Sequence, residues 1–356
     1  MKDESIIALS EIINVQQDRL IKYNAQLKDS ITSHLESESG TIFMYQDITT
    51  SERYVVKIKS ENYYIGLEQL VNQEHSEYFK QQFYTGCDIF MSKCTHIREV
   101  MLYTYEDEFL NEYFPPFLGS IKIAGNVYIV MRYIEFSNNE SLSQKTEASM
   151  RFLAKLHSRF FQRYDILNSM QLNTLSPKVF SDNKYLLETV YKTAIKQVEL
   201  PKKLSIEIAN YINRIEDEVT SMQKQGLTLC HCDFAFRNMT MNSGKLTVID
   251  WEMAMGLEPQ FDLVEFLIDY PEKLDSHLIF DIIQKYITNS ECCSIDSSKN
   301  YIVFYNAMLR NLYQYFVVRL AGLILINRIF PIPWINESTQ NCISLWKYII
   351  NSLNRK

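Results

Sequence analysis

Three polar residues stand at spacings that suit the transfer of a phosphoryl group: Asp233, Asn238 and Asp250. Such a transfer depends mostly on positioning and charge neutralisation, so few protein groups take part in the covalent change. The Asp233 carboxylate could accept the proton of an acceptor hydroxyl. The amide oxygen of Asn238 and the carboxylate of Asp250 are hard oxygen ligands of the kind that Mg²⁺ prefers. These residues predict a phosphotransferase site with Asp233 as the base and Asn238 and Asp250 as metal ligands.

Short β runs lead into both motifs, although the sequence around them has a helical pattern. Residues 227–230 are Leu-Thr-Leu-Cys and run into the first motif, and residues 246–249 are Leu-Thr-Val-Ile and run into the second. A loop of the form H-x-D-x-x-x-x-N, a short hairpin and then an Asp at the end of an apolar strand follow the order of the catalytic and metal-binding loops in protein-kinase-like folds.

These motifs resemble those of one family of small-molecule kinases. His231-x-Asp233-x4-Asn238, followed by Ile249-Asp250-Trp251-Glu252, is similar to the aminoglycoside phosphotransferase and choline kinase-like family, which has D-[FW]-[DE] where protein kinases have D-F-G. The resemblance implies ATP and Mg²⁺ as cofactors and a hydroxyl group of a small molecule as the acceptor. It covers residues 37–270, and the rest of the chain matches only in being helical.

Two further segments fit the same family. Residues 153–157, Leu-Ala-Lys-Leu-His, resemble the helix that packs beneath the catalytic loop, and residues 261–263, Phe-Asp-Leu, resemble the segment whose aspartate braces that loop. The resemblance implies supporting roles for Asp262 and His231, because the neighbouring aspartate of the loop does the chemistry. In most relatives a glycine follows the histidine, so Cys232 is a departure, although its side chain is small.

A kinase-like nucleotide site also needs a strand lysine that holds the phosphates and a helix glutamate that orients it. Lys57, in the β-rich run of residues 54–58, is the candidate lysine. Lys59 is the alternative, because it lies two residues on and therefore on the same face of the strand. We favour Lys57, which β-branched residues bracket, over Lys59, which is expected at the strand end. Glu99 is the candidate glutamate, because its surroundings resemble the R-E-x-x-x-Y helix of the family.

The loop over the phosphates is expected at residues 36–45, where Gly40 is the only glycine. The whole chain has 9 glycines, so hydroxyl groups such as that of Ser39 would have to donate hydrogen bonds in place of a glycine-rich backbone. This loop departs from the family pattern. Further on, Met131 and Tyr133 stand in a segment that resembles the hinge whose backbone groups bind the adenine edge.

The hydrophobic pattern divides the 356 residues into a β-rich part and a larger helical part. The main expected elements are a helix over residues 4–30, a hairpin of residues 41–45 and 54–58, a helix over 94–109, a strand pair of 118–123 and 126–134, and long helices that include 301–329 and 338–353. We therefore predict an α+β, protein-kinase-like fold of two lobes. Residues 1–136 would form the nucleotide-binding lobe, and residues 137–356 the helical lobe with the catalytic loop and the acceptor site.

Charge and cysteine usage bear on partners and location. The net charge is -7 and no run of Lys or Arg occurs, which disfavours nucleic-acid binding. Seven cysteines without a C-x-x-C pair indicate reduced thiols and a cytoplasmic protein. The apolar stretch of residues 316–334 contains Arg319 and Arg328, so it is predicted to be a core helix rather than a membrane span.

The acceptor is expected between the catalytic loop and the helices that follow residue 262. Acidic side chains there (Glu258, Glu265 and Asp269) could favour a cationic acceptor, and Trp251 or Trp334 could stack on one. Two alternatives stay open: a weak or inactive kinase-like binding or scaffold protein of the spore-coat type, and a kinase with a peptide or protein acceptor. The sequence indicates neither the acceptor's identity nor the oligomeric state.

Overall fold

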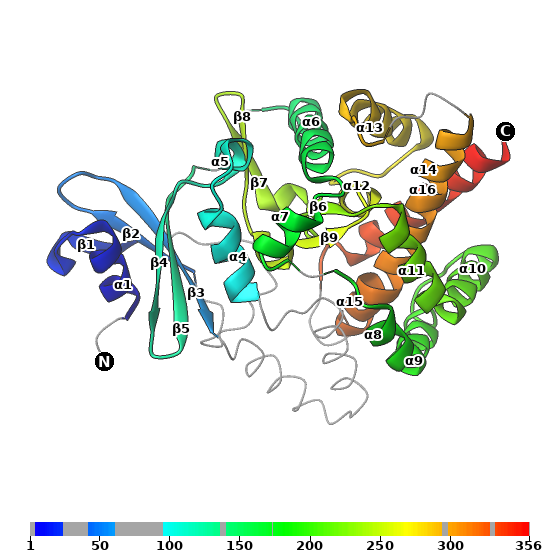
Figure 1. Ribbon diagram of the computed structural model, residues 1–356, viewed down its shortest axis with the longest axis horizontal. Coiled ribbons are helices and arrows are strands. Elements are labelled where there is room, and N and C mark those ends of the chain that lie inside the picture. The colour runs from blue at the N-terminus through cyan, green and yellow to red at the C-terminus, as the bar shows by residue number, and fades with distance from the viewer. Residues whose placement is uncertain are drawn as a thin grey trace. The chain divides into compact units, whose positions relative to one another are not determined.

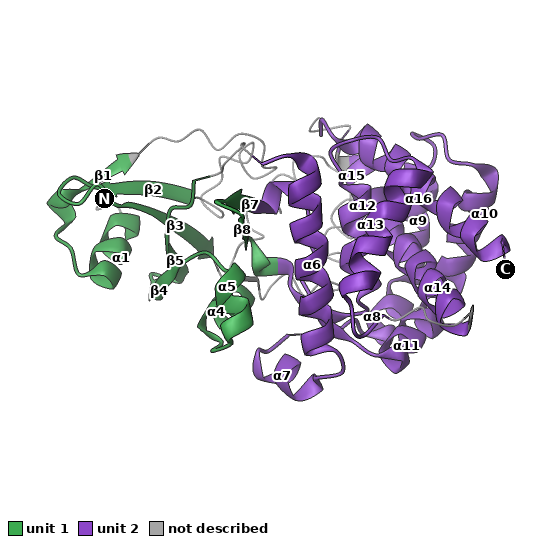
Figure 2. Cartoon of the chain, turned by 90° about the horizontal axis from the view of Figure 1, so that it is seen from above, with its two compact units in different colours: residues 1–80, 92–137, 240–252 green, residues 81–91, 138–239, 253–356 purple. Residues whose placement is uncertain are grey.

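The computed structural model describes residues 4–23, 42–60, 95–135, 140–172, 174–293, 298–327 and 332–355. Ser39 and Gly40 of the expected phosphate loop lie outside the described residues, as does the expected lobe boundary at residue 136. The chain divides into two compact units (Figure 2): residues 1–80, 92–137 and 240–252 form unit 1, and residues 81–91, 138–239 and 253–356 form unit 2. The division into residues 1–136 and 137–356 stays a prediction.

A five-stranded sheet in which neighbouring strands are antiparallel forms the centre of unit 1 (Figure 1). Its strands, in the order β1-β2-β3-β5-β4, are β1 (Leu20–Tyr23), β2 (Ile42–Asp47), β3 (Arg53–Ser60), β4 (Phe117–Ile123) and β5 (Asn126–Arg132). The two expected strand pairs are thereby confirmed. Along β3, Tyr54, Val56 and Ile58 belong to a buried apolar cluster. Because side chains alternate across a strand, Lys57 and Lys59 lie on the opposite face.

The apolar cluster lies between this sheet and the first helix, α1 (Glu4–Ile13), which contributes Ala8 and Leu9. The expected helix over residues 4–30 is wrong over residues 14–23, and residues 24–30 lie outside the described residues. Asn14 has a φ of 55°, the left-handed conformation in which helices commonly end. The chain then enters β1, where Leu20 is buried and Ile21 is half exposed. Two faces with a period of two residues are typical of a strand.

Among its described residues, unit 1 also contains two further helices and a hairpin. The expected helix over residues 94–109 is two helices, α4 (Thr95–Thr104) and α5 (Glu108–Tyr113). Asp107 separates them, because its side chain accepts a hydrogen bond from the Leu110 backbone N–H at 3.0 Å and caps α5. The hairpin is formed by β7 (Met239–Asn242) and β8 (Lys245–Val248), and α5 packs against β8.

The described residues of unit 2 are mainly helical and include a short strand pair, β6 (Thr228–Cys230) with β9 (Met255–Leu257). Its helices are α6 (Leu142–Phe160), α7 (Tyr164–Ser169), α8 (Pro177–Asp182), α9 (Lys184–Ala194), α10 (Lys202–Asn213), α11 (Ile215–Gln225), α12 (Gln260–Ile268), α13 (Ser276–Asn289), α14 (Ser298–Tyr315), α15 (Ala321–Ile326) and α16 (Ile335–Asn354). A small sheet-based part and a larger helical part confirm the α+β class.

Helix α12 forms the centre of unit 2, packed against α14 and α16, and every one of its residues is buried. Two of them, Asp262 and Glu265, carry carboxyl groups. A buried carboxylate is costly unless hydrogen bonds or opposite charges satisfy it. The groups that bind these two carboxylates therefore show which part of the structure α12 holds in place.

The expected single helix over residues 301–329 is interrupted. Helix α14 ends at Tyr315, a π-helical turn follows over Phe316–Leu320, and α15 begins at Ala321. A π turn holds more residues than an α turn, so it changes the direction in which the following side chains point. Arg319 lies in this turn. None of the helices in the described ranges is long and apolar enough to cross a membrane.

Candidate active site

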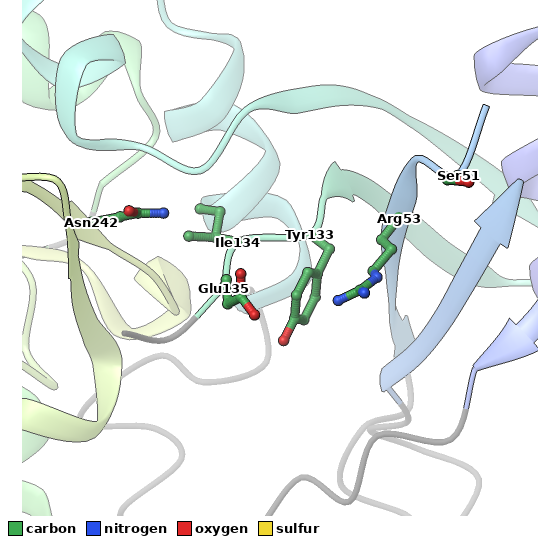
Figure 3. A pocket seen from close by; sticks show the side chains of 6 residues that line it. All are labelled: Ser51, Arg53, Tyr133, Ile134, Glu135 and Asn242. Carbon is green, nitrogen blue, oxygen red and sulfur yellow. The ribbon is translucent and has the colours of Figure 1, made fainter. Parts of the chain in front are cut away.

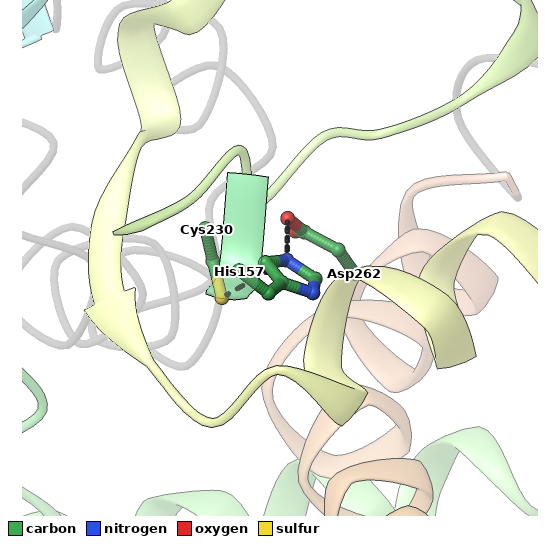
Figure 4. Close-up of side chains that lie close together, drawn as sticks. All are labelled: His157, Cys230 and Asp262. Atoms are coloured by element: carbon green, nitrogen blue, oxygen red, sulfur yellow. Dashed lines mark hydrogen bonds and ion pairs between the residues drawn. The ribbon is translucent and has the colours of Figure 1, made fainter. Parts of the chain in front are cut away.

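The loop after β6 is held by the carboxylate of Asp262. Asp262 Oδ2 accepts a hydrogen bond from the His231 backbone N–H at 2.8 Å, and Oδ1 accepts one from the Cys232 N–H at 2.9 Å. His157 Nε2 lies 3.2 Å from Asp262 Oδ2 and 4.0 Å from Cys230 Sγ, as Figure 4 shows. Because both Asp262 oxygens already serve the loop, this buried group is a structural brace rather than a metal site.

Cys232 has a φ of 60°, in the left-handed region that glycine adopts without strain. This conformation gives a physical reason for a glycine at this position in relatives. The Cys232 side chain is buried, as is that of Cys230. A small unbranched side chain is the kind of departure that the position tolerates.

Asp233 and Asn238 lie in contact within the loop. Asn238 Nδ2 donates to Asp233 Oδ2 at 2.7 Å and to the Asp233 backbone carbonyl at 2.8 Å. The other carboxylate oxygen, Oδ1, accepts hydrogen bonds from the guanidinium groups of Arg237 and Arg319. Burial would raise the pKa of Asp233, but Arg319 and then Arg237 outweigh it and hold the pKa well below its usual range. Asp233 is therefore ionised at neutral pH.

Arg319 joins the loop to α12. Besides Asp233, it donates to the Cys232 backbone carbonyl at 3.0 Å and to Glu265 Oε1. Glu265 Oε2 in turn accepts the Phe234 backbone N–H at 2.8 Å. Sequence reasoning missed the roles of Arg237 and Arg319. The available signals were the position of Arg237 inside the motif and the presence of Arg319 in an otherwise apolar stretch.

In unit 1, Lys57 is surrounded by carboxylates. Its Nζ lies 3.0 Å from Glu99 Oε1 and 3.3 Å from Glu252 Oε2, and it also contacts Asp250 Oδ1. Burial opposes the charge on this lysine, but Asp250 and then Glu99 outweigh it, so the pKa of Lys57 is raised. Tyr103 donates to Glu99 Oε1 at 3.2 Å and fixes that carboxylate. The lysine and glutamate that the family resemblance pairs thus lie together.

Lys59, the alternative lysine, is the last residue but one of β3 and so lies near the strand end, as expected. Its Nζ contacts Glu252 Oε2, and its side chain is only 5% exposed. Lys57 thus contacts both carboxylates of the Asp250-Trp-Glu252 motif, and Lys59 contacts that of Glu252. Lys57 Nζ lies 3.0 Å from Glu99 Oε1, which favours it as the nucleotide lysine; that role stays a prediction.

The donor set in unit 1 fits a hard divalent cation. Carboxylate oxygens of Glu99, Asp250 and Glu252 lie within 4.8 Å of one another. Carboxylate oxygens are the ligands that Mg²⁺ takes, and it binds through one or two of them together with substrate phosphates. Asp250 has a φ of 67°, a left-handed conformation of the kind that clusters at functional sites. Asn238, the other expected metal ligand, belongs to unit 2.

A pocket of about 500 Å³ lies at the segment that the sequence identifies as the hinge (Figure 3). Tyr133 lines it and Met131 does not; among the described residues the lining consists of Ser51, Arg53, Tyr133, Ile134, Glu135 and Asn242. The Arg53 guanidinium lies 5.7 Å from the centre of the Tyr133 ring. The pocket thus lies at the predicted hinge and has polar and aromatic side chains in its lining. Adenine binding by Met131 and Tyr133 stays a prediction.

The three acidic residues named as partners of a cationic acceptor already have arginine partners. Glu258 pairs with Arg310, Glu265 with Arg319, and Asp269 with Arg237 at 3.3 Å. Of the two tryptophans named for stacking, Trp251 is fully buried and donates to the Val248 carbonyl at 3.1 Å, whereas the Trp334 ring lies 5.6 Å from the Arg237 guanidinium.

Comparison with known families identifies the relatives of this chain. The family model described as choline/ethanolamine kinase matches residues 132–319, which are 188 of the 356 residues. The chain belongs to the choline/ethanolamine kinase family. The family resemblance drawn from the motifs is thereby confirmed. This member of the choline/ethanolamine kinase family is a small-molecule kinase, a phosphotransferase that acts on an alcohol group.

Solved structures are similar to this family member over most of its length. Choline kinase from Cryptosporidium parvum aligns with a TM-score of 0.51 and 11% identity, covering 99% of this chain and 97% of that one. A choline/ethanolamine kinase family protein from Mesorhizobium loti aligns with a TM-score of 0.47 and 12% identity, covering 89% and 90%. The first of these likenesses confirms the two-lobed kinase-like fold. No curated protein matches the chain significantly.

Proposed function

We propose that this kinase uses ATP and Mg²⁺ to phosphorylate a hydroxyl group of a small molecule, with Asp233 as the general base. The observation that carries the proposal is the catalytic loop: an ionised carboxylate at Asp233 lies 2.7 Å from the Asn238 amide and is held by a loop that Asp262 braces. A base must be ionised before it can take a proton, and this one is ionised throughout the neutral range.

The other residues of the site would bind either the nucleotide phosphates or the metal ion. Lys57, oriented by Glu99, would bind the nucleotide phosphates, as the strand lysine does in kinases of this fold. Asn238 and Asp250 would hold Mg²⁺, which neutralises charge on the transferring phosphoryl group. Asp233 would accept the proton of the attacking hydroxyl, so that the oxygen becomes a better nucleophile as the new bond forms.

Replacement of the base tests the proposal. Asp233→Asn keeps the shape of the side chain and removes its basicity, so we expect kcat to fall by about 10²–10⁴-fold. Binding of Mg-ATP, measured as a thermal shift, should persist. Asp182→Asn is a matched control, because Asp182 is exposed on α8 and, among the described residues, its side chain pairs only with Lys178, four residues away. Turnover by Asp233→Asn at the rate of the control would refute the assigned base.

A further inference from the structure

Two adjacent cysteines, Cys292 and Cys293, lie just after α13 with their thiols in contact. The two Sγ atoms are 3.7 Å apart. Ser158 of α6 holds this segment, because its Oγ accepts hydrogen bonds from the Glu291 backbone N–H at 2.8 Å and from the Cys292 N–H at 3.4 Å. The Cys293 N–H in turn donates to Ser290 Oγ at 3.2 Å. The backbone beneath the two thiols is therefore fixed to α6.

The two thiols differ in access and in ionisation. Among the cysteines that the structure describes, Cys292 is partly exposed and the others are buried. A hydrogen bond from the Cys293 thiol holds the pKa of Cys292 below its ordinary value, although partial burial acts in the other direction. The same hydrogen bond and burial raise the pKa of Cys293. Because the thiolate is the nucleophilic form, Cys292 is the reactive thiol of the pair.

The other described cysteines lack this combination of access and ionisation. Cys230, Cys232 and Cys342 are 0%, 1% and 0% exposed. Burial raises the pKa of Cys230 and of Cys342, so these two thiols stay protonated at neutral pH. Buried cysteines in such surroundings are inert toward external reagents. Among the described residues, thiol chemistry is therefore directed to the adjacent pair.

Adjacency in the chain sets the kind of bond that the pair would form. Cα atoms of consecutive residues are about 3.8 Å apart, whereas those joined by a disulfide are usually about 4.4–6.8 Å apart. A disulfide between Cys292 and Cys293 would therefore be strained, and strained disulfides are the labile, easily reduced ones. Its formation would bring the two sulfur atoms from 3.7 Å to about 2.0 Å, so at least one of them must leave its present contacts.

The contacts of Cys293 lead to the brace of the catalytic loop. Cys293 Sγ lies 3.6 Å from Tyr286 Oη, which lies 2.8 Å from His157 Nδ1. His157 Nε2 lies 3.2 Å from the carboxylate of Asp262, which holds the loop (Figure 4). All four side chains are buried and belong to unit 2. A contiguous run of packed, hydrogen-bonded side chains of this kind can carry coupling between two sites.

We propose that Cys292 and Cys293 form a vicinal dithiol that reacts reversibly with low-molecular-weight disulfides, and that the resulting protein disulfide loosens the Asp262 brace. The Cys292 thiolate attacks one sulfur of the external disulfide, forms a mixed disulfide and releases a thiolate, which takes up a proton. The Cys293 thiol then loses its proton and attacks Cys292 Sγ, and the second external thiolate leaves. The two cysteines are thereby oxidised, and the external disulfide is reduced to two thiols.

Oxidised glutathione tests the site, with peptide mass spectrometry as the measurement. Cys87 and Cys94 lie outside the described residues, so the protein used carries Cys87→Ser and Cys94→Ser. We expect the peptide with Cys292 and Cys293 to lose the mass of two hydrogen atoms and to regain it with dithiothreitol. Cys342→Ser, at a buried cysteine of α16, is the matched control and should leave this reaction unchanged.

Serine variants of the pair separate its two roles. Cys293→Ser should stop at the glutathione adduct on Cys292, because no thiol remains to displace the second glutathione. Cys292→Ser should react as slowly as the buried thiols, because the partly exposed thiolate is gone. Absence of a disulfide between the two residues, or an adduct that forms equally fast in Cys292→Ser, would overturn the site.

Amide hydrogen exchange tests the link to the catalytic loop. Oxidation of the pair should speed exchange in the loop peptide by about 2–30-fold, in line with couplings carried by packed networks. Tyr286→Phe removes the hydroxyl between Cys293 and His157, so oxidation of that variant should change the exchange little. Tyr185→Phe is the control, because Tyr185 is an exposed tyrosine of α9. A disulfide that forms without faster exchange in the loop would overturn the link.

Turnover gives a second readout of the same link. Oxidation should lower kcat, measured as ADP release with choline or ethanolamine as the acceptor, by about 2–30-fold, and dithiothreitol should restore it. Failure of the proposed kinase function would appear as no turnover in the reduced protein. The mass and hydrogen-exchange results do not depend on turnover, so they then decide the inference alone.

Discussion

At Cys232 the backbone conformation and the side chain favour different residues. A φ of 60° suits glycine, whereas the chain carries a cysteine whose side chain is buried. A non-glycine residue in this region costs on the order of 1–2 kcal/mol. Hydrogen bonds from the backbone N–H groups of His231 and Cys232 to the Asp262 carboxylate hold this conformation in place. The strain therefore lies one residue before the proposed base.

Two substitutions at this residue should have opposite consequences. Cys232→Gly removes the strain and a small side chain together, so we expect the free energy of unfolding to change by less than about 1 kcal/mol and turnover to be kept. Cys232→Val places a β-branched side chain at a positive φ and should destabilise the protein by about 1–3 kcal/mol. Urea unfolding and turnover measure both. Similar losses in the two variants would show that the sulfur contacts, rather than the backbone, set the preference.

Single residues of the site were predictable where the motif is local. Asp233, Asn238 and Asp250 stand out because their spacing along the chain is itself the signal. The arginine contacts on Asp233 were not predictable in this way. Arg319 reaches Asp233 across 86 positions of sequence, and its side chain belongs to a turn whose geometry the apolar pattern does not reveal.

The elements around α12 depend on buried charge as well as apolar packing. Just before α12, Glu258 is buried and bonds to Arg310 of α14 and, at 2.8 Å, to Asn311 Nδ2. Burial raises the pKa of Glu258 above its ordinary value, even though Arg310 acts in the other direction. Removal of the arginine leaves a buried carboxylate without its counter-charge, which is costly.

We therefore expect Arg310→Met to destabilise the protein by about 3–5 kcal/mol at pH 7. The loss should be smaller at pH 5 than at pH 8. A carboxyl with a raised pKa in the folded state binds a proton more readily when folded than when unfolded, so stability rises as the pH falls through that pKa. Urea unfolding across this range checks the sign. The double variant Glu258→Leu with Arg310→Met should recover much of the loss, and an additive further loss would contradict this account.

Helices and strands were predictable where side-chain periodicity decides them. The two hairpins of the first sheet and most helices of unit 2 follow from that pattern. The helix expected over residues 4–30 was wrong over residues 14–23 because apolar residues continue past Asn14, where the backbone turns left-handed. The helix over residues 301–329 was wrong in its middle because a π turn preserves the apolar character of the sequence while changing its geometry.

At the scale of the whole molecule, ligand binding should be visible as stability. A ligand at 100 times its dissociation constant adds about 2.7 kcal/mol to the free energy of unfolding. For a chain of this length that corresponds to a rise in Tm of about 4 °C. We expect Mg-ATP to produce this rise in the wild-type protein. Its absence would favour the alternative of a kinase-like binding or scaffold protein.

Substitution of the two buried lysines then identifies the nucleotide lysine. Lys57→Met should abolish the rise, because Lys57 lies between Glu99 and Asp250. Lys59→Met should keep most of it, and Lys178→Met, at an exposed lysine of α8, is the control. A rise that survives in Lys57→Met and disappears in Lys59→Met would assign the phosphates to Lys59.

The two-lobed class was predictable from the order of β-rich and helical sequence, whereas the division of the chain was harder to foresee. Residues 240–252 belong to unit 1, although the residues before and after them belong to unit 2. The hairpin β7–β8 and the Asp250 motif are in that segment. Asp250 is therefore far from Lys57 along the chain, although their side chains are in contact within unit 1.

The position of Arg319 depends on the number of residues in the π turn at Phe316–Leu320. Each residue added to or removed from an α-helix rotates everything beyond it by about 100° about the helix axis. Loss of one residue ahead of Arg319 in this turn would therefore swing the guanidinium away from Asp233, even where every remaining side chain stayed the same. Insertions and deletions here should be far less acceptable to the protein than exchanges of one aliphatic residue for another.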